Sequence, residues 1–183
     1  MASLLHIAVG MAAGRYLTRR RDPVAMVAMA GLSMLPDADV LAFPLGIPYE
    51  APLGHRGAAH SLVFALGTGS LCGLVARLRR KPWLSLAIVS VCVVASHPLL
   101  DAMTTGGQGV ALAWPWSTER FFLPWTPIPV SPIGLDFLSR RGLEVVLAEL
   151  LPSLPLMAYA LWPSSAARSS TPAHLLDSST RGD

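Results

Sequence analysis

The sequence predicts an all-α membrane protein, a polytopic bundle of about five helices with an interfacial loop rich in Pro and Trp. The first observation is composition: 52% of the 183 residues are hydrophobic and only 14% are charged, whereas soluble domains carry about 25% charged residues. The second is that the apolar residues form long runs, and the third is that basic residues gather in clusters between those runs. Such clusters more often set membrane topology than bind nucleic acid, so no nucleic-acid partner is expected.

Two short apolar helices are predicted at the start of the chain. The first covers residues 2–17, where Gly10 and Gly14 have the spacing of small residues that allows close helix packing. The second covers residues 24–35 and should end at Pro36, because a proline disfavours helical geometry in the residue before it. Both are shorter than the ~20 residues that a full span needs, so they are expected to tilt or to lie half-buried in the bundle.

The rest of the predicted bundle consists of three longer helices and two loops. Residues 40–57 are predicted to be a loop rich in Pro and Gly, followed by a helix over residues 58–76 that is long enough to span. A second long helix is predicted over residues 83–100, and the last over residues 143–162. Residues 104–135 are rich in Gly, Pro and Trp, which indicates an irregular segment at the membrane interface.

The domain boundary is expected near Pro163. Residues 1–163 hold all the apolar runs and are predicted to form one membrane-embedded domain, whereas residues 164–183 are rich in Ser, Thr and Ala and are expected to be a disordered tail. Cys72 and Cys92 lie inside apolar runs and are interpreted as small buried hydrophobic residues rather than as a disulfide or as thiolate ligands.

The basic clusters predict which helix ends lie outside. Lys and Arg favour the cytoplasmic side of a membrane, so the turns at residues 15–21 and 77–81 are placed there. The opposite ends of the first four helices then lie outside, at similar depth and close together. These ends carry the candidate ligands His6, Asp37, Asp39, His55, His60, His97 and Asp101. Arg140 and Arg141 also fall outside, which counts mildly against this topology.

The spacing of these residues suits metal coordination. His97 and Asp101 are four residues apart, so they lie on one helix face and can chelate one ion, although Pro98 should distort that turn. Asp37 and Asp39 follow a proline that ends a helix, where a loop can turn both carboxylates toward one ion. Ionisable groups at membrane depth are costly and usually functional, so the sequence predicts a metal site.

The segment around His55 and His60 adds a cation to the candidate ligands. The two histidines are five residues apart, which suits one ion if His55 lies in a loop and His60 in the first turn of the next helix. Arg56 between them cannot bind a metal ion but would attract an anion. Glu144 and Glu149, in the last helix, are expected to support the site or pair helices rather than to bind the ion.

Each of these features also has a simpler interpretation. A single histidine near a helix end, such as His6, is usually a packing or interface residue. An Asp-x-Asp pair commonly forms a turn or a helix cap. His97 and Asp101 could be a hydrogen-bonded pair between helices, and Arg56 could meet lipid headgroups. The candidate ligands at the ends of the first four helices are nevertheless all predicted to lie on one side of the membrane and at similar depth. This agreement favours the metal site.

Several stretches, in order along the chain, resemble a known family. They are His6, residues 35–39 (Leu-Pro-Asp-Ala-Asp), 55–61 (His-Arg-Gly-Ala-Ala-His-Ser), 97–101 (His-Pro-Leu-Leu-Asp), 104–106 (Thr-Thr-Gly), 127–129 (Pro-Ile-Pro) and 137–142 (Phe-Leu-Ser-Arg-Arg-Gly). Together they are similar to the membrane-bound metal-dependent hydrolases of the bacterial inner membrane, a family that includes LexA-regulated members. The resemblance covers roughly residues 4–150 and implies hydrolysis without naming a substrate. The chain differs at Ala59, where Thr is expected.

The function predicted on this basis is metal-dependent hydrolysis. Seven candidate ligands exceed the four of a tetrahedral zinc, so two divalent ions are plausible, with zinc as the first choice. Metal-activated water would attack a phosphoester or related bond, with Asp39 or Asp101 as the base and Arg56 holding the anionic group. An outward-facing site at the interface suits a lipid or lipid-linked substrate.

Two other classes of function remain open at this point. A metal-ion transporter or ion-binding membrane protein would need polar groups through the bundle, yet residues 62–76 and 83–95 offer only Ser, Thr and Cys. A structural or regulatory membrane protein with a folding metal would have a coordination shell with no open position.

Overall fold

The computed structural model describes residues 4–163, which form five α-helices and three 3-10 helices and contain no strand. The α-helices are α1 (Leu4–Thr18), α2 (Pro23–Met34), α3 (Leu62–Leu78), α4 (Trp83–Ala102) and α5 (Arg140–Leu161). The 3-10 helices are η1 (Leu35–Leu45), η2 (Ala58–His60) and η3 (Gly134–Leu138). The predicted all-α fold of about five helices is confirmed. The predicted tail over residues 164–183 lies outside the described residues.

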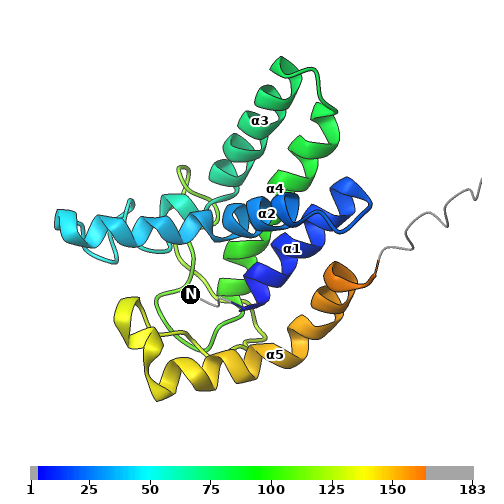
Figure 1. Ribbon diagram of the computed structural model, residues 1–183. Coiled ribbons are helices and arrows are strands. Elements are labelled where there is room, and N and C mark those ends of the chain that lie inside the picture. Colours follow the sequence, from blue (N-terminus) through cyan, green and yellow to red (C-terminus); the bar gives the residue numbers. More distant parts are fainter. Residues whose placement is uncertain (1–3, 164–183) are drawn as a thin grey trace, which may run out of the picture.

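The helices pack around α1 and α4. As Figure 1 shows, α1 lies against α2 on one side and α5 on the other, and α3 and α4 form a hairpin that projects from the rest of the molecule. The lower part of α4 contacts both α1 and α2. This arrangement brings the start of α1, the end of α2, the segment before α3 and the end of α4 toward one region.

Three helical segments are long and apolar enough to cross a membrane: Pro23–Leu45, Trp83–Ala102 and Arg140–Leu161. The first combines α2 with η1, because the α-helix ends before Pro36, as predicted, and a 3-10 helix follows it directly. The α-helix ends at Met34, and Pro36 lies in the first turn of η1, where a residue needs no N–H partner. The loop predicted to begin at residue 40 therefore begins only after η1.

The remaining predicted boundaries need smaller corrections. The helix predicted over residues 58–76 is the 17-residue α3, which begins at Leu62 and is shorter than the three candidate spans. Ser61 caps it, because its Oγ accepts the N–H of Phe64 at 3.1 Å. α4 continues through Pro98 to its end at Ala102. Residues 104–135 are irregular as predicted, with only isolated bridges among them until η3 begins.

The predicted close packing at Gly10 and Gly14 is confirmed. A Cβ at Gly14 would lie 2.6 Å from the carbonyl oxygen of Ala25 and the Cα of Met26. A Cβ at Gly10 would overlap the backbone of Ala30. Because the obstacle at both positions is the backbone of α2, only glycine lets α1 and α2 approach this closely.

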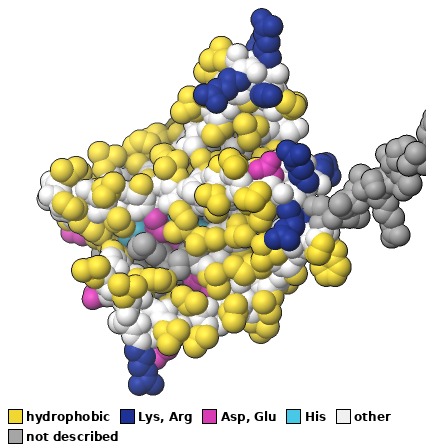
Figure 2. All heavy atoms as spheres, viewed as in Figure 1, with side chains coloured by type: hydrophobic (Ala, Val, Ile, Leu, Met, Phe, Trp, Pro, Cys, Tyr) yellow, Lys and Arg dark blue, Asp and Glu magenta, His cyan; other side chains and the backbone are white. Residues whose placement is uncertain are grey.

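The outside of the helices is apolar, and much of the inside is polar. Exposed side chains include Val24, Leu78 and Leu151, which are 80%, 75% and 75% exposed. Figure 2 shows hydrophobic side chains over most of one face and basic side chains near the tip of the α3–α4 hairpin and the α1–α2 turn. This distribution is typical of a protein whose helices face lipid.

Candidate metal centre

A buried cluster of His and Asp side chains lies where α2 and α4 meet the segment before α3. η1 supplies Asp37, η2 supplies His60, and the last turns of α4 supply His97 and Asp101. One donor atom from each of these four residues lies within 4.8 Å of the donor atoms of the others, and all four residues are buried. The structure therefore shows the convergence that the charge topology predicted for these residues.

The distances within this cluster have the size of a zinc site. The Nε2 atom of His60 lies 3.6 Å from Oδ1 of Asp37 and 3.4 Å from Oδ2 of Asp101. The Nε2 atom of His97 lies 3.4 Å and 3.9 Å from the same two oxygens. Ligand atoms placed about 2.0–2.2 Å from a tetrahedral zinc lie roughly 3.3–3.6 Å from one another. The four donors thus match that spacing or slightly exceed it.

Contacts on the far side of each ring direct both Nε2 atoms into the cluster. With the proton on Nδ1, His97 donates to the carbonyl oxygen of Ser33 at 2.8 Å. The Nδ1 atom of His60 lies 3.0 Å from Oδ2 of Asp39. A metal-binding histidine almost always donates its second N–H to a carbonyl or a carboxylate, which fixes the tautomer and the ring orientation. His97 follows this pattern, and the Asp39 carboxylate lies in the corresponding place beside His60, although the contact there does not have hydrogen-bond geometry.

Several buried polar atoms of the cluster have no hydrogen-bond partner among the described residues. They are both carboxylate oxygens of Asp37, both ring nitrogens of His60 and the Nε2 atom of His97. Buried polar atoms without partners are rare because they are costly. A divalent cation between two imidazoles and two carboxylates would satisfy both Nε2 atoms and the carboxylate, and this donor set suits zinc. The residues present therefore fit a metal ion.

The charge around His60 also favours a cation. Burial on its own would lower the pKa of His60, but the carboxylates of Asp101, Asp37 and Asp39 outweigh burial and raise the pKa to about 10. Three carboxylates around one imidazole carry a net negative charge whether or not the imidazole is protonated. A metal ion would neutralise this charge more completely than a proton.

A second group, Asp39, His55 and His60, adjoins the first and shares His60 with it. The Nδ1 atom of His55 lies 2.6 Å from Oδ1 of Asp39, and Oδ2 of Asp39 accepts the backbone N–H of Arg56 at 3.1 Å. The carboxylate of Asp39 is therefore fixed at both oxygens, in the position from which it orients His60.

His6 lies beside the cluster but outside both groups of donors. Its ring centroid is 4.0 Å from that of His97, and its Nε2 atom contacts the carbonyl oxygen of His97 at 3.3 Å. Its Nδ1 atom has no hydrogen-bond partner within residues 4–163. The hydroxyl of Ser33 donates to the carbonyl oxygen of His6 at 2.8 Å, so His6 and His97 are both tied to α2.

Arg56 is buried beside the cluster, only 1% exposed. Its Nε atom lies 3.1 Å from Oδ2 of Asp101. Its Nη1 atom donates to Oγ1 of Thr104 at 3.2 Å and to the carbonyl oxygen of Gly106 at 3.0 Å. Nη2 has no hydrogen-bond partner among the described residues. This depth argues against the interpretation of Arg56 as a headgroup anchor.

The backbone of Arg56 is held in an unusual conformation. Its φ angle is +63°, in the left-handed region that non-glycine residues rarely adopt. Asp39 accepts its N–H at 3.1 Å, and its carbonyl oxygen accepts the N–H of Ala111 at 3.0 Å. Gly107 makes room for the guanidinium, since a Cβ at Gly107 would lie 2.7 Å from Nη1. The surrounding structure thus holds a strained residue in place, as is common at functional sites.

Arg120 supports the site in a way that the sequence analysis missed. Its Nη1 atom donates to the carbonyl oxygen of His55 at 2.8 Å, and its Nη2 atom donates to the carbonyl oxygens of Tyr49 and Ala51 at 3.1 Å each. Arg120 therefore ties the irregular segment 104–135 to the loop that carries His55. Its only signal in the sequence is that Glu119 and Arg120 are the sole charged residues of that segment.

Glu149 pairs helices, as expected. Its Oε2 atom accepts the backbone N–H groups of Leu4 and Leu5 at 2.8 Å and 3.1 Å. N–H groups in the first turn of a helix have no partner within the helix, so Glu149 supplies the acceptor that they need. The helix dipole also favours a negative charge at the start of α1. Glu149 thereby fixes α1, and with it His6, against α5.

Comparison with known proteins gives one family. The sequence model described as YdjM inner membrane protein matches residues 1–171. The protein named "Inner membrane protein YbcI" of Escherichia coli (strain K12) is 41% identical over 171 residues, which cover 87% of this chain and 96% of the relative. No solved structure matches the chain.

Proposed function

Because this chain belongs to the YdjM family of inner membrane proteins and buries a His and Asp cluster that fits a metal ion, we propose that it is a membrane-bound metal-dependent hydrolase. The observation that carries the proposal is the geometry of His60 and His97. Each ring has an oxygen atom within 3.0 Å of its Nδ1 atom, and both Nε2 atoms face the same oxygens of Asp37 and Asp101. Such orientation of two imidazoles toward two carboxylates is typical of a metal site.

The proposal assigns one divalent ion, zinc as the first choice, to this cluster. His60, His97 and Asp37 hold the ion, which corresponds to the two-histidine, one-carboxylate set of catalytic zinc sites. Asp39 and His55 support His60 rather than binding a second ion. The chemistry that zinc supplies in such a site is a water molecule acidic enough to act as a nucleophile near neutral pH.

Asp101 and Arg56 have separate roles in this proposal. Asp101 accepts the proton of the attacking water, because its Oδ2 atom lies within reach of the donors of His60 and His97. Arg56 lies 3.1 Å from Oδ2 of Asp101 and so holds the carboxylate in position. The free Nη2 atom of Arg56 is available to hold an anionic oxygen of the substrate.

The substrate that suits this arrangement is a phosphoester or a related anionic ester, carried by a lipid or a lipid-linked molecule. A hollow of about 250 Å³, lined by Thr104, Thr105, Phe122 and Thr126, adjoins the residue that contacts Arg56. The proposal has a small anionic group of the substrate approach the guanidinium from this hollow, past Thr104. The apolar exterior of the helices supports a substrate that reaches the site from the membrane.

A structural metal is the second candidate, and one observation favours it. If Asp101 also bound the ion, four protein ligands would fill a tetrahedral zinc and leave no open position for water. The metal-transport alternative lacks comparable support, since the helix cores at residues 62–76 and 83–95 offer no His or acidic ligand, only Ser, Thr and Cys.

The experiment that separates hydrolase from structural protein uses Asp101→Asn. The purified protein in detergent should contain one metal ion per chain and should hydrolyse a member of a panel of phosphoesters and phospholipids. Asp101→Asn should keep the metal but lower turnover by ~100-fold or more, since the amide cannot accept the proton. Ser90→Ala, which removes a buried hydroxyl of α4 outside the cluster, should keep full turnover. Loss of the metal in Asp101→Asn, together with no turnover in the parent, would instead establish the structural site.

A further inference from the structure

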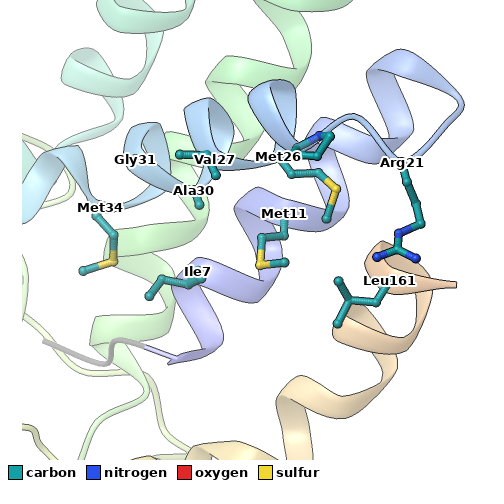
Figure 3. A pocket seen from close by; sticks show the side chains of 10 residues that line it. Ile7, Met11, Arg21, Met26, Val27, Ala30, Gly31, Met34 and Leu161 are labelled. Carbon is teal, nitrogen blue, oxygen red and sulfur yellow. The ribbon is translucent and has the colours of Figure 1, made fainter.

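A cleft of about 530 Å³ opens between α1 and α2 (Figure 3). Its walls are apolar and come from three helices: Ile7 and Met11 of α1, Met26, Val27 and Ala30 of α2, and Leu161 of α5. The volume falls within the roughly 300–1,000 Å³ of small-molecule pockets. None of the residues that line the cleft belongs to either group of candidate metal ligands.

One end of the cleft carries positive charge. Arg21 lines the cleft, and Figure 3 shows it reaching from the α1–α2 turn toward Leu161. Arg19 and Arg20 precede it in the chain, and Asp22, whose carboxylate lies 3.4 Å from Arg20, follows it. Residues 19–22 therefore carry a net positive charge in the sequence, which attracts anions to this end of the cleft.

We propose that this cleft binds an anionic phospholipid, with one acyl chain between α1 and α2 and the phosphate at the α1–α2 turn. The ligand must combine a long apolar part with an anionic group at one end, because the cleft combines an apolar wall with a basic end. In a protein whose helices face lipid, the abundant molecule of this chemistry is a phospholipid. Met11 and Met26 suit chains of varying length and saturation, since methionine side chains adapt their shape to what they contact.

The charge topology indicates which leaflet supplies the lipid. Basic clusters favour the cytoplasmic side, and the cytoplasmic leaflet is rich in anionic lipids. The proposed lipid site therefore faces the leaflet opposite to the one from which the metal site is proposed to take its substrate. Binding of this lipid is independent of the proposed hydrolase activity and requires no metal.

Gly31 offers a way to fill the cleft without disturbing the fold. It lies on the exposed side of α2 and lines the cleft, and a Cβ at this position would meet no atom within 4 Å. Leucine is also a better helix former than glycine, so Gly31→Leu should not weaken α2. Gly67 of α3 is the matched control, because it is also exposed and also has no atom within 4 Å of its Cβ position.

The test is native mass spectrometry of the purified full chain in detergent, titrated with phosphatidylglycerol or with phosphatidylcholine. The parent and Gly67→Leu should retain phosphatidylglycerol, whereas Gly31→Leu should retain it at least ~5-fold more weakly, since the acyl chain loses its place. Val27→Trp is a second variant that narrows the same cleft, at a side chain that is 72% exposed. It replaces Gly31→Leu in the test if Gly31→Leu has a lower melting temperature than the parent. Parental retention of phosphatidylglycerol by a folded cleft variant would overturn the proposal.

The headgroup is tested separately with Arg21→Gln. This variant should reduce the preference for phosphatidylglycerol over phosphatidylcholine by about 5-fold, the effect of one basic residue near a membrane surface. Arg140→Gln, at the start of α5 and away from the cleft, should leave the preference unchanged. Equal retention of the two lipids by the parent would overturn the anionic part of the proposal. Metal content should stay at the parental value in every variant, because the cleft and the cluster share no residue.

Discussion

At the scale of single residues, His60 is the position on which the candidate site depends. It is the one residue shared by the two groups of donors, with Nε2 facing Asp37 and Asp101 and Nδ1 facing Asp39. A ring that uses one nitrogen for the metal and the other for an orienting carboxylate defines which acidic residue binds and which supports. Asp37 binds in this interpretation, and Asp39 supports.

The first prediction separates binding from support. His60→Ala should remove most of the bound metal and lower the melting temperature, because metal binding is coupled to folding. Asp39→Asn should keep the stoichiometry at one ion per chain and weaken metal affinity roughly 10- to 100-fold, as for an orienting carboxylate. Elemental analysis and competition with a chelator measure both quantities, with His174→Ala, outside the described residues, as the control.

A different result would support the two-ion site that the ligand count allows. In that case Asp39→Asn would lower the stoichiometry from two ions to one, and His60→Ala would affect both ions.

The seven candidates could be picked out from the sequence because His and Asp are rare in an apolar chain. Their division into ligands and supports could not, because it depends on ring orientations that Ser33 and Asp39 impose through tertiary contacts.

At the scale of elements, the helices were more predictable than the segments between them. The Gly10 and Gly14 contact followed from spacing alone, because both residues lie on one face of α1. The direct continuation of α2 into η1 could not be predicted from the sequence. Pro36 is compatible with the first turn of a new 3-10 helix as well as with a helix end. This continuation places Asp37 within helical structure rather than in the expected loop.

The irregular segment 104–135 was predictable only as irregular. Its function in the fold is to hold the loop before η2, through Arg120 on the carbonyl oxygens of Tyr49, Ala51 and His55. Contacts of this kind leave no periodic pattern in a sequence, because the partners are backbone atoms of a distant loop. The guanidinium of Arg120 nevertheless fixes the loop that carries His55 and Arg56, because it donates to three carbonyl oxygens of that loop.

The second prediction tests this contact. Arg120→Gln should lower the free energy of unfolding by about 2 kcal/mol, since hydrogen bonds made by a charged group are worth ~1.5–3 kcal/mol. It should also weaken metal affinity, because the loosened loop carries His55, which contacts the Asp39 carboxylate beside His60. Thermal melting in detergent and chelator competition measure the two effects. Arg140→Gln, in an exposed pair with Glu144, should change neither, and equal melting of the two variants would contradict the role assigned to Arg120.

At the scale of the whole molecule, the position of the site follows from the alternation of helix directions. The candidate ligands lie near the start of α1, after α2, before α3 and at the end of α4, so they meet only if the four helices alternate in direction. The basic turns lie at the opposite ends of the same helices. Arg140 and Arg141, which counted against this topology, both contact the carboxylate of Glu144, at 3.5 Å and 3.4 Å, which reduces their effective charge.

The last prediction concerns the side of the membrane on which the metal site opens. The positive-inside rule places the α3–α4 turn in the cytoplasm and the loop between η1 and η2 outside. A cysteine introduced on each side can report this topology. In the loop, Glu50 is exposed and suits such a substitution, whereas Gly46 has a φ angle of +76° that would strain a cysteine. Arg79, with a φ angle of −86°, is an exposed probe for the other side.

In a chain with Cys72→Ala and Cys92→Ala, a membrane-impermeant thiol reagent added to intact cells should therefore label Glu50→Cys and should leave Arg79→Cys unlabelled. Permeabilised cells provide the control, since both positions should then react. Labelling of Arg79→Cys alone in intact cells would reverse the topology. The distances within the His and Asp cluster would be unaffected by that result, but the substrate would have to come from the cytoplasmic leaflet and the lipid in the α1–α2 cleft from the outer one.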